Sequence, residues 1–396
     1  MGRSHAGPIT GTFNVTAHER IVFGVPAGEA ILAEAERTGA QRVFVTSTRS
    51  LTQKQDGPLQ RVETALGSRH AGTYASIKSH SPREDVVAGA RAARAANADL
   101  LLAVGGGSVI DATKAMQLCL WLGLDSIEAM EPYCLGFERS KHSMLSLPPE
   151  PIRMVAISTT LSASEFTENA GITQSATNTK QSFRHRLFAP RVVILDPAAT
   201  LDTPDWLLFS TGIRSVDHAV ENYCNPKANP ATEALSLQGL KLLYRALPAI
   251  KRSPRDLAPR GEAQFGMWQA IAASAAGVPT GASHGIGYAL GATFGVAHGH
   301  TSCVMLPAVL KWNAAVNGER QKALAEAMGA PGQAAGDLIK ELVAGLDQPV
   351  TLREVGIKRD NLGELARRAL NYHPVQVNPR PIKSVGDVME ILELAW

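Results

Sequence analysis

ADLLLAVGGGSVIDATK, residues 98–114, is the stretch of sequence that decides the fold. The run Leu100–Val104 is wholly apolar and too short for a helix, so it predicts a strand buried on both faces. Gly105, Gly106 and Gly107 follow at once; they permit a positive φ and a close approach to a ligand, and Asp111–Lys114 predicts the first turns of a helix. Unpaired N–H groups and the positive end of the helix dipole would then converge, which predicts an anion site suited to a diphosphate.

The glycine turn matches neither the Walker loop, GxxxxGK[ST], nor the dinucleotide fingerprint GxGxxG. A tight turn between strand and helix that binds no ligand is therefore the alternative interpretation. The strand before the turn and the polar side chains of Ser108, Asp111 and Lys114 after it favour the binding site.

Composition indicates a two-domain protein, since 396 residues with 45% hydrophobic and 19% charged residues can bury large cores. The net charge of +3 is scattered along the chain, so neither a nucleic-acid surface nor a membrane surface is indicated. The four cysteines show no CxxC pairing and are expected to be buried thiols in a reducing compartment. Residues 1–10 lack the apolar core of a signal peptide, and we expect a cytoplasmic protein.

Strands and helices alternate over the first half of the chain, whereas the second half is dominated by helical patterns. This indicates an α/β Rossmann-like domain, residues 1–198, followed by an all-helical domain, residues 199–396, with the active site in the cleft between them. The α/β elements expected are an edge hairpin (12–24), a helix (27–39), a strand (42–46), a helix opened by a capping box at Ser81 (82–97), two further strands (154–157, 192–195) and an irregular segment, a lid or an insertion (124–151). The expected helices of the second half are 204–223, 230–249, 262–276, 318–328, 332–346, 359–370 and one that follows the Asn-Pro-Arg-Pro motif at 378–381.

The motif GGGSxxDxxK after an apolar strand resembles that of the iron-containing (group III) alcohol dehydrogenases, more specifically their maleylacetate-reductase-like branch. The resemblance runs from about Gly11 to Trp396 and includes the Asn-Pro-Arg-Pro ending. It implies an oxidoreductase that transfers a hydride between a nicotinamide cofactor, NAD or NADP, and a small carbonyl or alcohol substrate. We also expect a homodimer.

The resemblance assigns the cofactor to the glycine turn and to the segment STTLSASEFT, residues 158–167. An ordinary loop rich in serine and threonine is the alternative. The stretch Ser47-Thr48-Arg49, after the second strand, contains no acid to repel a 2′-phosphate, so NADPH is not excluded. The cofactor-binding residues expected are Thr48, Gly105, Gly106, Gly107, Ser108, Asp111, Thr159, Thr160, Ser162, Thr167 and Lys180.

Three histidines, His218, His284 and His298, coincide with the metal-binding histidines of the family. The position of the fourth ligand, an aspartate in metal-dependent members, holds Arg214, which cannot ligate a cation and would repel one. Asp217 points about 100° away around the helix and is not expected to replace it. We therefore expect a site that has lost its metal, although three neutral histidines could still hold zinc.

The expected catalytic residues are Arg214, the three histidines and Tyr288, which stands where many family members have a further histidine. Arg214 and the neighbouring donors would stabilise the developing alkoxide in place of the ion. Arginine would also suit a carboxylate-bearing substrate such as maleylacetate.

Three hypotheses follow: a metal-independent NAD(P)H-dependent reductase, an iron- or zinc-dependent alcohol dehydrogenase, and a cofactor-binding relative without catalysis. We favour the first. A lyase of the dehydroquinate-synthase type fits the ending and the threonine segment less well.

Overall fold

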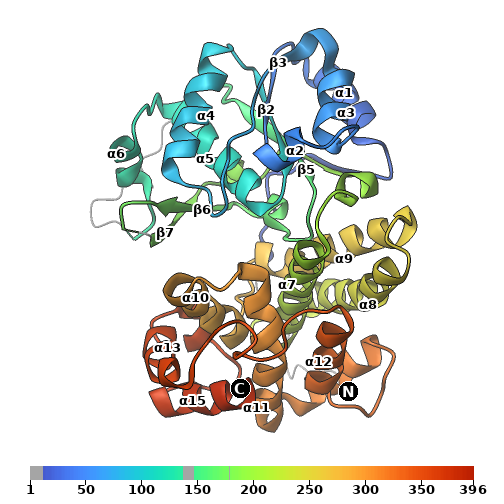
Figure 1. Cartoon of the computed structure of the whole chain (residues 1–396), viewed down its shortest axis with the longest axis vertical. Helices are drawn as coiled ribbons and strands as arrows, with labels where there is room; N and C mark the ends of the chain where they lie inside the picture. Colours follow the sequence, from blue (N-terminus) through green and yellow to red (C-terminus); the bar gives the residue numbers. More distant parts are fainter. Residues whose placement is uncertain (1–11, 137–146, 178) are drawn as a thin grey trace. The chain divides into compact units, whose positions relative to one another are not determined.

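The computed structural model describes residues 12–136, 147–177 and 179–396. The chain divides into two compact units (Figure 1). One comprises Thr16–Thr203, and the other comprises the chain from Pro204 to Trp396 together with residues 12–15. Asn14 joins the helical unit because its backbone N–H and its side-chain amide both donate to Ala276 O, at 3.2 and 3.0 Å.

The described residues of the first unit form a six-stranded parallel sheet with the order β1-β8-β5-β4-β2-β3. Its strands are β1 (Arg20–Phe23), β2 (Val43–Thr46), β3 (His70–Tyr74), β4 (Leu100–Gly105), β5 (Arg153–Ser158) and β8 (Val192–Leu195). The helices of this unit are α1 (Ala27–Thr38), α2 (Arg49–Thr52), α3 (Pro58–Leu66), α4 (Arg83–Ala95), α5 (Gly107–Leu122) and the single turn α6 (Ile127–Met130).

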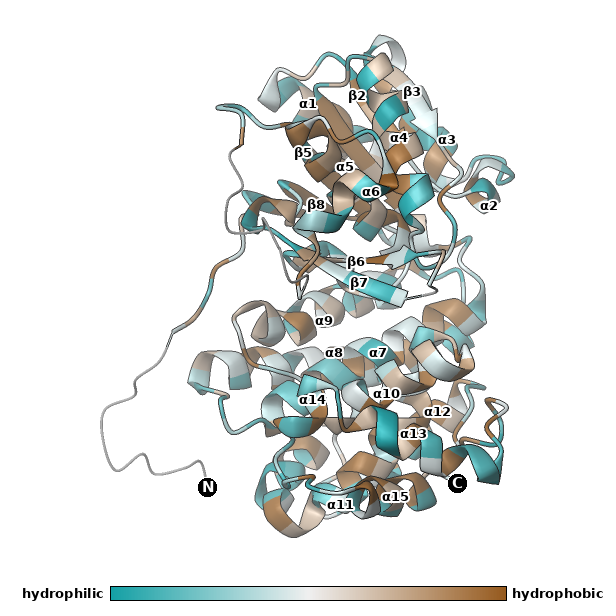
Figure 2. Ribbon diagram, turned by 90° about the vertical axis from the view of Figure 1, so that its left-hand side faces the viewer, coloured by the Kyte–Doolittle hydropathy of each residue, from teal (hydrophilic) through white to brown (hydrophobic). Residues whose placement is uncertain are grey.

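Strand β4 confirms the prediction of a strand buried on both faces. Leu101 and Ala103 pack with α4 and α5, whereas Leu100, Leu102 and Val104 pack with α1 and α3. Figure 1 shows these two pairs of helices on opposite faces of the sheet, and Figure 2 shows the hydrophobic colour on β5. The parallel α/β architecture predicted for this half of the chain is therefore confirmed.

The second unit is helical in its described residues, as predicted. Its helices are α7 (Asp205–Cys224), α8 (Pro230–Arg252), α9 (Leu257–Ala275), α10 (Ala282–Phe294), α11 (His298–Ala327), α12 (Ala335–Gly345), α13 (Leu362–Ala369), α14 (His373–Gln376) and α15 (Val385–Leu394). One core joins α10, α11, α13 and α15. In the described residues no helix is long and apolar enough to cross a bilayer.

Three local predictions were wrong. Residues 12–24 form no hairpin, because the one strand there, β1, pairs in parallel with β8. Ser81 does not cap α4: it has a φ of 52°, and its hydroxyl donates to Ser108 O at 2.7 Å. None of the three glycines at 105–107 has a positive φ, so their role is close packing rather than an unusual backbone conformation.

The sequence analysis did not foresee the antiparallel hairpin of β6 (Asn169–Gln174) and β7 (Thr179–Arg184), nor helix α10. The hairpin is tied to the sheet unit by Arg83, whose buried guanidinium donates to Glu131 and to Gln181 on β7. Much of the irregular segment predicted at 124–151 lies outside the described residues, and its described part includes α6.

Candidate functional site

The glycine turn lies at the switch point of the parallel sheet. From β2 the chain moves outward to β3, and it then returns across β2 to place β4 on the other side. The carboxyl ends of β2 and β4, which carry Thr48 and Gly105–Gly107, are therefore adjacent. Open α/β sheets bind their ligands outside the carboxyl ends of the strands at such a point.

The threonine segment closes directly on the glycine turn. A Cβ at Gly106 would lie 2.8 Å from Thr160 Cγ2, and a Cβ at Gly107 would lie 3.0 Å from Ser162 Oγ. Real Cβ atoms are not found as close as 2.8 Å to another heavy atom, so a side chain at Gly106 would displace Thr160, and one at Gly107 would require a small shift of Ser162. The structure thus brings together Gly106, Gly107, Thr160 and Ser162, four of the residues that the sequence analysis assigned to the cofactor.

Helix α5 begins at Gly107, and in the described residues no side chain accepts a hydrogen bond from the N–H of Gly107 or Ser108. A helix start without such an acceptor suits a phosphate. The side chain of Ser108 has a different partner, because its hydroxyl accepts from the N–H of His80 at 3.0 Å. Thr48 precedes α2, and its hydroxyl pairs with that of Ser50 at 2.9 Å.

Lys114, the last residue of GGGSxxDxxK, has a structural role. Its fully buried ammonium donates to Ser164 O at 2.6 Å, to Asn169 O at 2.9 Å and to Thr167 Oγ1 at 3.1 Å. Burial lowers the pKa of Lys114 to about 8. Lys114 therefore links α5 to the threonine segment. Thr167, which the sequence analysis expected at the cofactor, is one of the acceptors of the Lys114 ammonium.

Asp111 links the same helix to the hairpin. Its carboxylate accepts from the hydroxyl of Ser164 and from the N–H of Gly171 on β6 at 3.0 Å. The side chain of Lys180 on β7 lies over Gly171. A Cβ at Gly171 would be 2.2 Å from Lys180 Cε and 3.5 Å from the carboxylate of Asp111. The fold thus directs the Lys180 side chain towards the helix that follows the glycine turn.

A second cluster is built within the helical unit by α7, α10 and α11. Helix α7 supplies Arg214, Asp217, His218 and Glu221, helix α10 supplies His284 and Tyr288, and α11 begins with His298. Figure 1 shows α7 and α10 in this unit. All five residues that the sequence analysis expected to be catalytic belong to this cluster.

His284 is fully buried and makes contacts at both ring nitrogens. Its Nδ1 donates to Glu221 Oε2 at 2.7 Å and lies 3.3 Å from Asp217 Oδ2, and its Nε2 lies 3.5 Å from His218 Nε2. Burial and the charge of Arg214 oppose protonation, but Asp217 and Glu221 outweigh them and raise the pKa of His284. The two carboxylates therefore shift the protonation equilibrium of His284 towards the imidazolium.

His218 is the neutral partner of this pair. Burial, followed by the charges of His284 and Arg214, lowers the pKa of His218 well below its ordinary value. In the described residues its buried Nδ1 has no hydrogen-bond partner.

Arg214 is held by α7 and α11. Its guanidinium donates to Ser302 Oγ at 2.9 Å, lies 3.8 Å from Asp217 Oδ2 and lies 5.7 Å from the centre of the Tyr288 ring. Burial raises the pKa of Tyr288, although Arg214 opposes this, so the hydroxyl keeps its proton at neutral pH. His298 is parallel to the Tyr288 ring, with 6.0 Å between the ring centres.

Ligand-type atoms of Asp217, Glu221 and His284 lie within 4.8 Å of one another. Two donors on one tetrahedral zinc ion would be roughly 3.4 Å apart, but the 2.7 Å between His284 Nδ1 and Glu221 Oε2 is a direct hydrogen bond. Both carboxylates lie on the Nδ1 side of the ring, whereas His218 lies on the Nε2 side. Asp217 thus lies on the opposite side of the His284 ring from His218.

The sequence analysis did not assign Glu221, the serines that support Asp217, or an active role for Asp217. Ser283 and Ser302 donate to Asp217 Oδ2 at 2.8 and 2.6 Å. The sequence did contain a signal for Asp217 and Glu221, because residues 214, 217, 218 and 221 have the spacing of one helix face. The serines carried no such signal, since their role depends on helices that meet only in the folded chain.

Comparison with known proteins identifies the same family as the sequence motifs did. Residues 18–197 match the family model "Iron-containing alcohol dehydrogenase", and residues 208–396 match "Fe-containing alcohol dehydrogenase family, C-terminal". Dehydrogenase FUM7 of Gibberella moniliformis is 32% identical, with 95% of each chain covered. A maleylacetate reductase of Sphingobium indicum is 29% identical, also with 95% of each chain covered.

The solved structure of maleylacetate reductase from Agrobacterium tumefaciens is similar over 98% of each chain, with a TM-score of 0.81 and 26% identity. These matches extend over both units and make the protein an NAD(P)-dependent oxidoreductase. The chain belongs to the iron-containing alcohol dehydrogenase family, in its maleylacetate-reductase-like branch.

Proposed function

We propose that the protein is an NAD(P)H-dependent carbonyl reductase that works without a metal ion. The observation that carries the proposal is the charge balance of the buried cluster in the helical unit. Arg214, Asp217 and Glu221 are buried beside His284, and with His284 protonated this set holds two positive and two negative charges. A divalent cation beside His218 would add two charges to a balanced and buried set, which is costly in a medium of low dielectric constant.

Bound NAD(P)H supplies the hydride that adds to the substrate carbonyl carbon. The oxygen of that carbonyl gains negative charge as the hydride arrives, and Arg214 and the Tyr288 hydroxyl stabilise it. His284 supplies the proton. Its Nε2 faces His218 Nε2 at 3.5 Å, so the proton passes to the product oxygen directly or through His218.

The glycine turn and the threonine segment hold the cofactor in this proposal. The first N–H groups of α5 bind the diphosphate, and the hydroxyls of Thr159, Thr160 and Ser162 lie at the same edge of the sheet. No acid follows β2 at Ser47–Arg49, so a 2′-phosphate is not repelled there. We expect NADPH and NADH to be used at rates within about tenfold of each other.

Elemental analysis of the purified protein tests metal independence. We expect neither iron nor zinc at one equivalent, and we expect oxidation of NAD(P)H by the substrate to continue unchanged after treatment with a chelator. One equivalent of metal in the protein, together with loss of activity on chelation, would overturn the proposal.

Arg214→Asp is the sharpest variant for the same question. It removes the stabilising cation and restores a carboxylate at the position of the missing ligand, so we expect loss of activity on the native substrate and gain of metal binding. Arg214→Met is the matched control, because it removes the charge without adding a ligand. If the two variants bind metal equally, the carboxylate is not what the site lacks.

The second candidate is an iron- or zinc-dependent alcohol dehydrogenase. One observation favours it: the 3.5 Å between the Nε2 atoms of His218 and His284 also suits two ligands of one ion. Metal analysis separates the two candidates.

The substrate is a small carbonyl compound, and keto acids are one class, because a cationic pocket favours carboxylates. A panel of aldehydes, ketones and keto acids, each tested with NADH and NADPH at the nicotinamide absorbance, identifies the class.

The homodimer and the cytoplasmic location stay predictions. Light scattering of the purified protein measures the oligomeric state.

A further inference from the structure

Helix α10 carries His284 in its first turn, yet its N-cap residue, Gly281, has no side chain to cap it. The N–H groups of Gly281 and Ser283 donate instead to Glu221, at 2.8 and 2.7 Å. The N–H between them, that of Ala282, donates to Asn378 Oδ1 at 3.2 Å. Side chains from two distant segments of the chain thus cap the helix that presents His284.

Gly281 is closed in by both of these caps. A Cβ there would lie 2.9 Å from Glu221 Oε1 and 3.1 Å from Asn378 Oδ1. The first turn of α10 therefore has little freedom to move while the two side chains are in place. Glu221 also accepts from His284 Nδ1, so the support of the helix and of the imidazole ring is shared.

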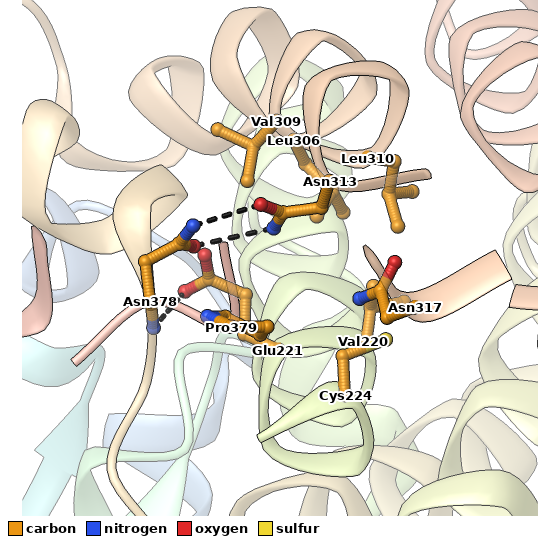
Figure 3. Close-up of a pocket in the computed structure, with 11 residues that line it drawn as sticks. Val220, Glu221, Cys224, Leu306, Val309, Leu310, Asn313, Asn317, Asn378 and Pro379 are labelled. Carbon is orange, nitrogen blue, oxygen red and sulfur yellow. Dashed lines mark hydrogen bonds between the residues drawn. The ribbon is translucent and has the colours of Figure 1, made fainter. Parts of the chain in front are cut away.

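Asn378 is itself held in one orientation. Its amide pairs reciprocally with that of Asn313 on α11, at 2.8 and 3.2 Å, and its Nδ2 also donates to Arg380 O at 2.8 Å. Figure 3 shows this amide pair beside Glu221. Only 7% of Asn378 is exposed, so water does not compete for these bonds.

Residues 377–381, which contain the Asn-Pro-Arg-Pro motif, are fastened to α11. Arg380 donates to Trp312 O at 2.9 Å, and its guanidinium lies 3.8 Å from the centre of the Trp312 ring. Just before them, Val375 packs against α10 so tightly that a Cβ at Gly285 would be 2.5 Å from Val375 Cγ2. The segment is thus anchored on both sides of Asn378.

We propose that Asn378 is a positioning residue for His284, and that the Asn-Pro-Arg-Pro segment serves to hold it against the start of α10. Asn378 fixes the first turn of the helix, and the turn fixes the His284 ring between Glu221 and His218. The inference rests on the proposed role of His284 as proton donor and adds the residue that orients it.

Asn378→Ala tests the proposal. Its cofactor site is untouched, so we expect kcat to fall roughly ten- to hundredfold while the KM for NADH stays within about twofold. Asn378→Asp keeps an acceptor for the Ala282 N–H but loses the Nδ2 donations to Asn313 Oδ1 and Arg380 O, so we expect its kcat to lie between those of Asn378→Ala and the unmodified protein. The matched control is Asn317→Ala, which truncates another buried amide on the same cavity, of about 10 Å³, that Asn378 lines (Figure 3). In the described residues Asn317 makes no hydrogen bond to α10, and its Oδ1 accepts from Gln321 Nε2 at 2.9 Å, so kcat should stay near that of the unmodified protein.

A proton spectrum supplies a readout that does not depend on turnover. The His284 Nδ1–H that donates to Glu221 should give a low-field resonance, identified by its loss in His284→Gln. We expect this resonance to shift or disappear in Asn378→Ala and to persist in Asn317→Ala. An unchanged resonance with unchanged kcat in Asn378→Ala would overturn the proposal, as would equal losses in the two alanine variants. If the unmodified protein reduced no carbonyl, the proposed function would fail, but the resonance would still test the positioning.

Discussion

Helices α5 and α10 both have a glycine as their N-cap residue, and the N–H groups of their first turns have different partners. At α5 the described residues place no side-chain acceptor on the N–H groups of Gly107 and Ser108. At α10 the corresponding N–H groups donate to Glu221 and Asn378. An uncapped start favours an anion from outside, whereas a start already bonded to a carboxylate of its own chain becomes a rigid support.

The same contrast holds for the packing around each glycine. Gly106 is closed in by Thr160, a hydroxyl residue of the proposed cofactor site, and Gly281 is closed in by Glu221 and Asn378. Both glycines allow close approach of a neighbouring side chain, but the first lies at a helix start without a side-chain acceptor, and the second lies at a start that is bonded to the chain itself. A glycine before a helix therefore indicates a binding site only where the helix start is not already capped from elsewhere in the fold.

The largest effect is expected at the uncapped start. Gly106→Val should lower the affinity for NAD(P)H by more than about a hundredfold, because the side chain displaces Thr160 and obstructs the diphosphate. Fluorescence titration with NADH measures the affinity, and circular dichroism checks that the fold is kept. An affinity equal to that of the unmodified protein would reject the assignment of the turn as a phosphate site.

At the capped start the expected loss is in turnover. Glu221→Gln leaves one acceptor oxygen for the N–H groups that Glu221 now holds, so we expect kcat to fall by about a hundredfold and the affinity for NADH to stay within about twofold. Steady-state kinetics measures both quantities. Glu319→Gln, at an exposed position on α11, is the control, and a parallel loss of cofactor affinity in Glu221→Gln would contradict the division of roles.

The difference between the two starts also explains what the sequence could predict. The strand, glycine turn and start of α5 follow each other in the chain, so their pattern is local and was predicted. Helix α10 contains three glycines, at 285, 287 and 291, and therefore has weak local helix propensity; it is held by caps from residues 221 and 378. Its first turn depends on contacts that no local pattern contains.

The candidate site divides in the same way. The histidines and Arg214 were identified from a resemblance along one segment at a time, and the structure brings them together. Asp217 and Glu221 were not assigned, because their importance lies in what they face across the helical unit. The hairpin of β6 and β7 was missed for a different reason: β7 is exposed and polar, as its hydrophilic colour in Figure 2 shows, so it lacks the apolar run that marks a buried strand.

A smaller effect is expected where the hairpin approaches the uncapped start. Gly171→Ala should displace Lys180, whose Cε would be 2.2 Å from the new Cβ, and should weaken cofactor binding about tenfold if the ammonium contacts the cofactor. In a Lys180→Met background the same substitution should cost nothing further. NADH titration measures the affinity, and equal losses in the two backgrounds would show that Gly171 acts through another group. Gly345→Ala is the control for the general effect of the change, because a Cβ at Gly345 meets nothing within 4 Å.

Two buried glutamates, Glu221 and Glu165, differ in their hydrogen bonding, and this difference should affect how the stability of the protein depends on pH. Glu221 receives several hydrogen bonds, whereas both carboxylate oxygens of Glu165, in the threonine segment, are buried without a partner in the described residues. Burial raises the pKa of Glu165 from 4.5 to about 7. The folded protein therefore holds this proton more tightly than the unfolded chain does, and the stability linked to it is present below pH 4.5 and is lost as the pH rises to about 7.

Glu165→Gln removes this linkage, because an amide does not titrate. Relative to the unmodified protein, its free energy of unfolding should improve by roughly 2 to 3 kcal/mol between pH 5 and pH 8. Urea unfolding at the two pH values measures this change, and the same pair of measurements on Glu319→Gln gives the background. A difference between variant and unmodified protein that does not change with pH would mean that Glu165 is ionised in the folded protein throughout, and that the buried carboxylate has a donor after all.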